Sequence, residues 1–201
     1  FEDFKIYLPK FLSAKSTKEL FEGLKDFPEN IDTRVYTTYL SDSKVIYQGD
    51  GIQDLLVLNL PSTKIDTAPS VILSNTCDMD LSHERNYSAQ IVYSPIFNLN
   101  KYRNKLLIKS EKTKDQIDSH ITSIKKQMIT QIFYLPKFEN RLNESIVFFD
   151  RVYNLPNTYI EREKLNETRL FTLSDYGFYL FLLKLSVHFT RIQDSVERKS
   201  L

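Results

Sequence analysis

The sequence predicts an α+β protein in which short β-strands form a small barrel or sandwich and helices pack against it. Two observations support this fold class. Between residues 33 and 97, short segments rich in Val, Ile, Leu and Tyr alternate with polar turns, which is typical of antiparallel β-structure. After residue 113, isoleucines recur at helical spacing, and a later apolar run occupies residues 178–183.

The first predicted element is a short helix that begins at Ser16 and ends before Pro28. Ser16 and Glu19 match the capping box, in which the serine caps the helix and the glutamate reaches back to the cap. A proline disfavours the helical conformation of the residue before it, which ends this helix. Residues 33–40 should then form a strand, because their valine, threonine and tyrosine residues favour extended structure.

The predicted barrel is built from short strands that follow one another along the chain. Two glycines flank Asp50 and allow the positive φ angles of a tight turn there. Polar loops are expected at residues 61–69 and 76–86. The strands are expected at residues 45–47, 55–60, 70–74, 89–94, 146–152 and 158–162. The barrel core should therefore comprise residues 33–100 together with residues 144–162.

Two longer helices are expected to pack on this barrel within a single domain of residues 1–201. The first covers residues 113–132, because large apolar side chains recur there every three or four residues and so share one helix face. They are Ile117, Ile121, Ile124, Met128 and Ile132. The second covers residues 174–197 with Ser174 as its cap, and its apolar first half should be packed between other elements.

The composition excludes several classes of protein. Hydrophobic residues make up 41% of the chain and charged residues 26%, as in an ordinary globular protein. Cys77 is the one cysteine, so no internal disulfide forms and a reducing, cytoplasmic location is expected. No apolar run approaches the roughly 20 residues of a membrane span. The chain has 4 glycines and no metal-binding motif, so neither a glycine-rich nucleotide loop nor another cofactor site is predicted.

Two segments of the predicted barrel resemble a known family. Residues 68–75, Ala-Pro-Ser-Val-Ile-Leu-Ser-Asn, and residues 93–96, Tyr-Ser-Pro-Ile, resemble the MazF/PemK family of bacterial toxin endoribonucleases in order and spacing. The resemblance covers residues 45–97 and implies a small SH3-like barrel, in which Gly49-Asp50 opens a strand. The Ser-Asn-Thr-Cys-Asp sequence at residues 74–78 is also similar to a variant in uncharacterised bacterial proteins.

One position departs from the toxin pattern. The resemblance implies an arginine directly before the proline, where it takes part in RNA cleavage, but this chain has Ala68. A guanidinium group can contact phosphate through two N–H donors and stabilise charge that develops during cleavage, whereas alanine can do neither. The resemblance therefore implies the barrel, but Ala68 cannot supply the group that the toxins use for RNA cleavage, and the helices after residue 100 lie outside the toxin pattern.

Basic residues are concentrated in one part of the chain. The net charge is +1, but residues 101–141 carry 10 basic and 4 acidic residues, whereas residues 1–100 carry 9 basic and 14 acidic ones. Such a block can mark a face for phosphates or be a solvated helix surface. Nearby aromatic residues, including Phe97 and Tyr102, could stack on bases or fill the core. The residues expected to contact RNA or DNA are Asn75, Arg85, Arg103, Lys105, Lys109, Lys112 and Lys125.

A polar loop after the strand at residues 70–74 contains the candidate catalytic residues. Cys77 could act as a nucleophile with His83 as its base and Asp78 orienting that base. The alternative is a buried cysteine at the strand end, with Asp78 capping the turn through its own side chain. No metal site is predicted in this loop, because its carboxylates lack the spacing of a known metal motif.

The sequence is compatible with three functions. The favoured hypothesis is a bacterial barrel protein that is the nucleic-acid-binding or effector component of a toxin-like or phage-defence system, with a protein partner from the same operon. The first alternative is a Cys77-dependent enzyme, such as a ribonuclease-like hydrolase. The second is a non-catalytic module that docks other proteins through its helices. Salt-dependent binding to RNA or DNA would distinguish the favoured hypothesis from the others.

Overall fold

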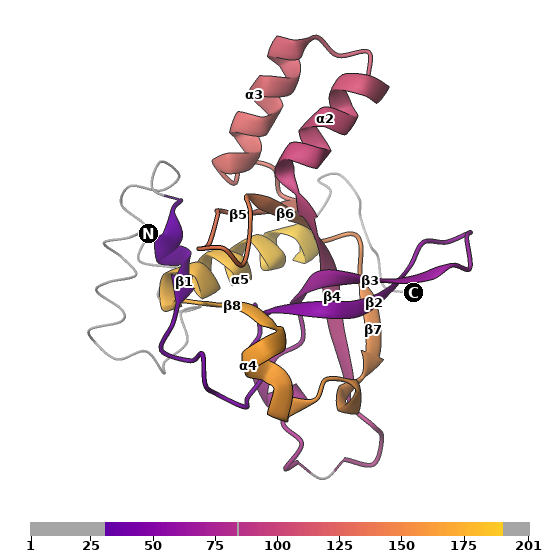
Figure 1. Ribbon diagram of the computed structural model, residues 1–201, viewed down its shortest axis with the longest axis vertical. Helices are drawn as coiled ribbons and strands as arrows, with labels where there is room; N and C mark the ends of the chain where they lie inside the picture. The colour runs from indigo at the N-terminus through magenta and orange to yellow at the C-terminus, as the bar shows by residue number, and fades with distance from the viewer. Residues whose placement is uncertain (1–30, 84, 191–201) are drawn as a thin grey trace, which may run out of the picture.

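The computed structural model describes residues 31–83 and 85–190, and these form an α+β fold on an open antiparallel sheet (Figure 1). Eight strands run in the order β1-β8-β2-β3-β4-β6-β5, and β7 pairs with β4. The predicted α+β class is confirmed. The predicted helix that begins at Ser16 lies outside the described residues, as does the part of the predicted last helix beyond residue 190.

Short elements make up most of the described chain. The strands are β1 (Tyr36–Thr37), β2 (Gly51–Leu58), β3 (Ile65–Ile72), β4 (Gln90–Asn98), β5 (Ile132–Leu135), β6 (Ser145–Phe148), β7 (Tyr153–Pro156) and β8 (Arg169–Leu173). The α-helices are α2 (Leu99–Lys109), α3 (Lys114–Lys125), α4 (Leu165–Thr168) and α5 (Asp175–Thr190). Single turns of 3-10 helix are η2 (Thr33–Val35), η3 (Thr76–Met79), η4 (Asn157–Tyr159) and η5 (Arg162–Lys164).

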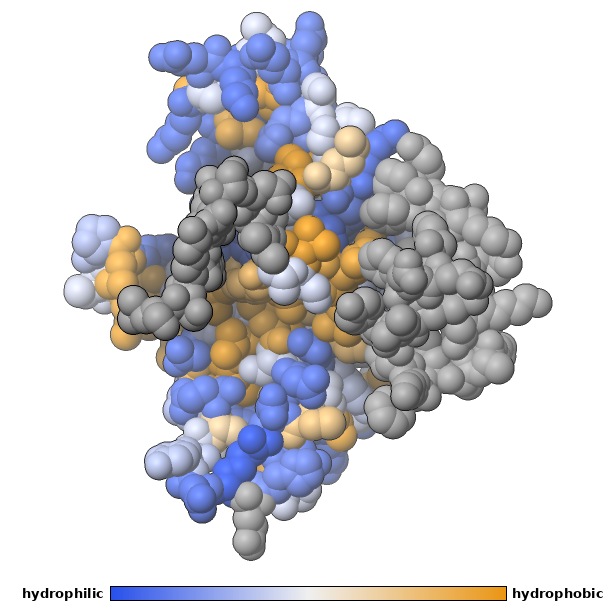
Figure 2. Space-filling view, turned by 180° about the vertical axis from the view of Figure 1, so that it is seen from behind, coloured by the Kyte–Doolittle hydropathy of each residue, from blue (hydrophilic) through white to orange (hydrophobic). Residues whose placement is uncertain are grey.

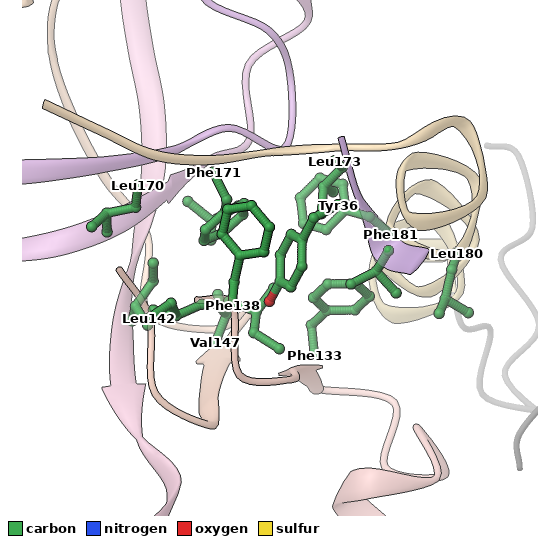
Figure 3. Packing of buried hydrophobic residues seen from close by; sticks show 14 of the residues in the cluster. Tyr36, Phe133, Phe138, Leu142, Val147, Leu170, Phe171, Leu173, Leu180 and Phe181 are labelled. Atoms are coloured by element: carbon green, nitrogen blue, oxygen red, sulfur yellow. The ribbon is translucent and has the colours of Figure 1, made fainter. Parts of the chain in front are cut away.

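The expectation of a closed barrel is wrong. β1 and β5 lie at the two ends of the sheet and do not pair with each other. β1 has only two residues, too few for a closing ladder. A hydrophobic core joins these ends instead (Figure 3). The ring of Phe181 on α5 meets that of Phe133 on β5 with centroids 5.3 Å apart, and the hydroxyl of Tyr36 on β1 donates to the carbonyl of Pro136 at 2.7 Å.

Several strands begin or end away from their predicted positions. The expected loop at residues 61–69 contains the first half of β3, and residues 45–47 form no strand. The predicted strand at residues 146–152 is confirmed only as far as Phe148, and residues 158–162 follow β7 instead of forming a strand. Strands β5 and β8 were not expected, because their residues are buried on both faces and show no alternation of apolar and polar side chains.

The helices differ from prediction mainly at their ends. The expected helix at residues 113–132 is confirmed for α3, which begins after the capping residue Thr113 and buries Ile117, Ile121 and Ile124. It stops at Lys125, and Met128 is exposed. The residues before it form an additional helix, α2, so that α2 and α3 make a hairpin between β4 and β5. Within the described ranges, no helix is both long and apolar enough to span a membrane.

A buried ion pair fastens the segment before β2 to strand β8. The side chains of Asp50 and Arg169 are 0% and 3% exposed, and the Arg169 Nε lies 3.2 Å from Oδ2 of Asp50. The guanidinium also donates to the carbonyls of Leu40 at 2.8 Å, Ser43 at 3.0 Å and Val45. Burial raises the pKa of Asp50 to about 6, although the Arg169 charge opposes that rise. The Arg169 side chain thus donates to all three carbonyls, and the backbone N–H of Ser43 also donates to that of Leu40 at 3.1 Å.

A buried lysine fastens α5 to the turn that follows α3. The Nζ of Lys184 donates to the carbonyls of Gln127 at 2.8 Å and Ile129 at 2.6 Å, and its residue is 7% exposed. No acidic side chain within the described residues pairs with it. Burial lowers the pKa of Lys184 to about 7. A neutral amine has two N–H donors, and the two carbonyls match them.

We expect the Lys184 amine to make the protein more stable as the pH rises above neutrality. Its folded-state pKa is about 7, below the value of an unfolded chain, so the unfolded chain binds more protons between these two values. The free energy of unfolding should rise by at most about 1.4 kcal/mol per pH unit. Urea unfolding at pH values above 7 would measure this slope. The slope should be lost in Lys184→Met and kept in the exposed control Lys137→Met.

Candidate nucleic-acid interface

A groove of about 910 Å³ runs between helix α2, the strands β4 and β6, and the base of the β2–β3 hairpin. Helix α2 borders the groove because two contacts fix the start of the helix. The Asn98 side chain accepts from the backbone N–H of Lys101 at 2.9 Å, and Leu99 is buried in the core. The apolar part of the wall includes Phe97 and Phe148.

Three lysines of α2 share the face that lines the groove. Lys101, Lys105 and Lys109 stand four residues apart, so that each lies about 6 Å further along the helix axis than the one before. All three are exposed, and none forms an ion pair within residues 31–83 and 85–190. Three positive charges in a row are costly beside one another, and an anionic ligand would relieve that repulsion.

Two arginines add positive charge from the opposite wall. Arg141 precedes β6 and is in loose contact with Glu139, with Nε and Oε2 3.9 Å apart. Arg151 follows β6, and its guanidinium lies over the rings of Phe97 and Phe148, at 5.0 Å and 4.6 Å from their centroids. Among the described residues that line the groove, Asp54 is the only acid. The groove therefore combines five basic side chains with one carboxylate.

Aromatic rings form a continuous part of the groove wall. Phe148 meets Phe97 and Tyr102 edge to face, with centroids 5.5 Å and 5.7 Å apart. The Tyr102 hydroxyl is 3.1 Å from Nε2 of His120 on α3, which holds its ring in place. Burial raises the pKa of Tyr102 and lowers that of His120, so both groups are neutral near pH 7. Tyr102 and His120 therefore add no charge to the aromatic wall, in which Phe148 is buried and Phe97 and Tyr102 are half-buried.

The predicted basic residues on and around α2 and α3 do not share one surface. Lys105 and Lys109 line the groove. Arg103 instead pairs with Asp118 on α3, with Nη2 and Oδ1 2.6 Å apart, and Lys125 pairs with Glu144 at 2.5 Å. These two residues hold the α2–α3 hairpin together and fix it to the start of β6. Lys112 lies in the turn between α2 and α3, outside the groove wall.

The predicted catalytic loop lies at the other end of the molecule from α2 and α3 (Figure 1). Asn75 caps η3 by accepting from the backbone N–H of Cys77 at 3.0 Å. Arg85 donates to the Cys77 carbonyl at 3.1 Å and contacts Oδ1 of Asp78 at 3.5 Å. Neither Asn75 nor Arg85 lines the groove.

This loop shows no assembled catalytic group. Cys77 is exposed, so the alternative of a buried cysteine is wrong. No hydrogen bond joins Cys77, Asp78 and His83 as a triad within the described chain. Nor does any group of three or more His, Cys, Asp or Glu side chains in those residues have the arrangement of a metal site.

Lys101, Arg141 and Arg151 are the basic groove residues that the predicted contact residues did not include. The two arginines flank β6, 32 to 50 residues after the lysines of α2, and the pairing of β4 with β6 brings the two segments together. A usable signal was that Arg151 lies within the predicted strand at residues 146–152 and Arg141 lies five residues before that strand. Searches of protein-family models and of curated proteins find no match for this chain.

Proposed function

We propose that this protein binds single-stranded nucleic acid along the groove beside α2. The lysine row would neutralise successive phosphates, and the aromatic wall with Arg151 would stack on unpaired bases. This combination is how proteins hold single strands without strong sequence preference. The observation that carries the proposal is the charge of one groove. Among residues 31–83 and 85–190, its wall has two arginines, three lysines without an ion-pair partner and a single acid.

A role in a toxin-like or phage-defence system belongs to the same proposal. It is supported by the resemblance of residues 45–97 to the MazF/PemK toxins and by the consecutive antiparallel strands β2, β3 and β4 in that segment. We infer from this a relationship to SH3-like barrels in which the sheet has stayed open. The exposed thiol of Cys77 supports a reducing, cytoplasmic location.

Charge reversal of the lysine row tests the proposal. Lys101→Glu, Lys105→Glu and Lys109→Glu together should weaken binding to a fluorescent 20-nucleotide RNA or DNA strand by about 100-fold at low salt. The slope of log K against log salt should fall by about 2, because each lost phosphate contact with a single strand contributes about 0.7. Fluorescence anisotropy over a salt series would measure both quantities.

A matched triple variant controls for overall charge. Lys112, Lys114 and Lys137 are exposed and lie outside the groove wall, so reversing them should leave most of the affinity and of the salt slope in place. The proposal is wrong if the wild-type protein binds no single strand at low salt, or if both triple variants lose affinity equally.

The stacking contribution of Arg151 is separately testable. Arg151→Ala removes a guanidinium that lies over two rings, and loss of one stacked base contact should weaken binding about tenfold. Because one charge is removed, the salt slope should change by less than 1. Equal losses for a single strand and for a duplex of the same sequence would show that Arg151 contacts phosphate and not bases.

A further inference from the structure

The hairpin of β2 and β3 leaves the sheet as a free two-stranded ribbon (Figure 1). Strand β2 pairs with β8 only at Gly51 and Ile52, and β3 pairs with β4 only over residues 70–72. Over residues 53–58 and 65–69, the outer edges of both strands therefore have no partner strand within the described residues. An isolated two-stranded ribbon is marginally stable in water, and an open edge is a template for another strand.

The end of this ribbon is apolar. Leu60 is 77% and Ile65 65% exposed. The register pairs Leu58 with Ile65, so their side chains lie on one face of the ribbon together with half-buried Leu56. Figure 2 shows hydrophobic residues on this projecting arm. Large exposed aliphatic side chains that gather in one place mark interaction surfaces.

We propose that the tip of β3 is the contact through which two copies of this chain associate. Two identical edges related by a two-fold axis pair antiparallel, so an open edge is complementary to its own copy. With the axis at Ile65, the two Ile65 side chains meet each other beside the two Leu58 side chains.

The charges at the tip favour this pairing, because it places opposite charges, and not like charges, across from one another. Lys64 and Asp66 are exposed and flank Ile65, and neither has an ion-pair partner among the described residues. In the two-fold arrangement, Lys64 of each copy stands opposite Asp66 of the other, which places two opposite-charge pairs across the new ladder. The groove beside α2 could not serve as such a contact, because two basic surfaces would repel each other.

Charge-swap variants test this geometry with the full chain. Sedimentation equilibrium should show the wild-type protein as a dimer that dissociates on dilution. Lys64→Glu and Asp66→Lys should each weaken dimerisation about tenfold or more, because each places two like-charged pairs at the contact. Mixing the two single variants should restore a heterodimer, and the double variant Lys64→Glu/Asp66→Lys should restore the homodimer.

Thermal unfolding of each variant, at a dilution where the wild-type protein is monomeric, controls for folding, and substitutions at these exposed positions should not shift it there. A wild-type protein that is monomeric at high concentration would overturn the proposal. So would a dimer whose affinity is the same in all the single variants, or single variants that stay monomeric when they are mixed. Ile65→Asp should abolish the dimer, and a dimer that survives it would also contradict the contact. None of these outcomes depends on nucleic-acid binding.

Discussion

Replacing Arg169 with leucine should lower the free energy of unfolding by about 3–5 kcal/mol, the usual result of leaving one buried charge unpaired. Asp50 would lose the charge 3.2 Å from its Oδ2. The carbonyls of Ser43 and Val45 would lose their donor, and that of Leu40 would keep only the backbone N–H of Ser43. Urea unfolding followed by circular dichroism would measure the loss. Arg141→Leu is the matched control, because Arg141 and its ion-pair partner Glu139 are both exposed.

The double variant Asp50→Asn/Arg169→Leu separates charge from packing. Asparagine carries no charge, so the double variant should be more stable than Arg169→Leu alone, with a coupling energy of at least about 1 kcal/mol. A double variant that loses the sum of the two single losses would show that the two side chains act independently.

The Arg169→Leu substitution should also change how the free energy of unfolding depends on pH. Arg169 is the charge that opposes the rise in the pKa of Asp50, so its removal should raise that pKa further above 6. A carboxyl whose folded-state pKa is raised binds more protons in the folded state, and stability then falls as the pH rises between the unfolded and folded values. Arg169→Leu should therefore be more stable at pH 5 than at pH 7.

Gly177→Ala should destabilise the protein by about 2–3 kcal/mol, although alanine favours helices by roughly 1 kcal/mol over glycine. Gly177 lies in α5, where an added Cβ would come within 2.1 Å of the carbonyl oxygen of Val35. Val35 belongs to η2, and its oxygen is backbone, so it cannot rotate away as a side chain would. Thermal unfolding would measure the loss as a lower melting temperature.

An exposed position of the same helix is the control. Ser186→Ala changes a solvated residue and should alter the stability by less than about 0.5 kcal/mol. If Gly177→Ala were as stable as the wild-type protein, η2 could move away from α5 at no cost, and the close approach of the two helices would not be required for folding.

The parts of the fold that sequence predicted well are those with a clear repeat. The spacing of Ile117, Ile121 and Ile124 predicts helix α3, and these side chains are buried as expected. Helix α2 was missed because it buries only Leu99 and has no apolar stripe. Strand β8 was missed because all five of its residues are buried, and a fully buried strand shows no alternation.

The sequence predicted that the candidate site is basic, but it did not predict which basic residues line the groove. The basic block after residue 100 pointed to Lys105 and Lys109, which line the groove. The same block also contained Arg103 and Lys125, whose charges are used in pairs with Asp118 and Glu144. Local sequence could not separate the two groups, because the pairing depends on how α2 and α3 pack and on where β6 begins. The catalytic role of Cys77, Asp78 and His83 stays a prediction, and no hydrogen bond within the described chain joins the three side chains as a triad.

The contacts of Arg169 also bear on the order in which the chain can fold during synthesis. Its acceptors at Leu40, Ser43 and Val45 lie 129, 126 and 124 residues earlier in the chain. A nascent chain that has not yet reached residue 169 lacks the donor of the Ser43 and Val45 carbonyls and the positive charge beside the Asp50 carboxylate. Only local backbone N–H groups are then available, that of Ser43 for the Leu40 carbonyl and that of Tyr47 for Asp50. Contacts of such large separation form slowly. The segment before β2 should therefore remain accessible to proteases and chaperones on the ribosome until residue 169 has emerged.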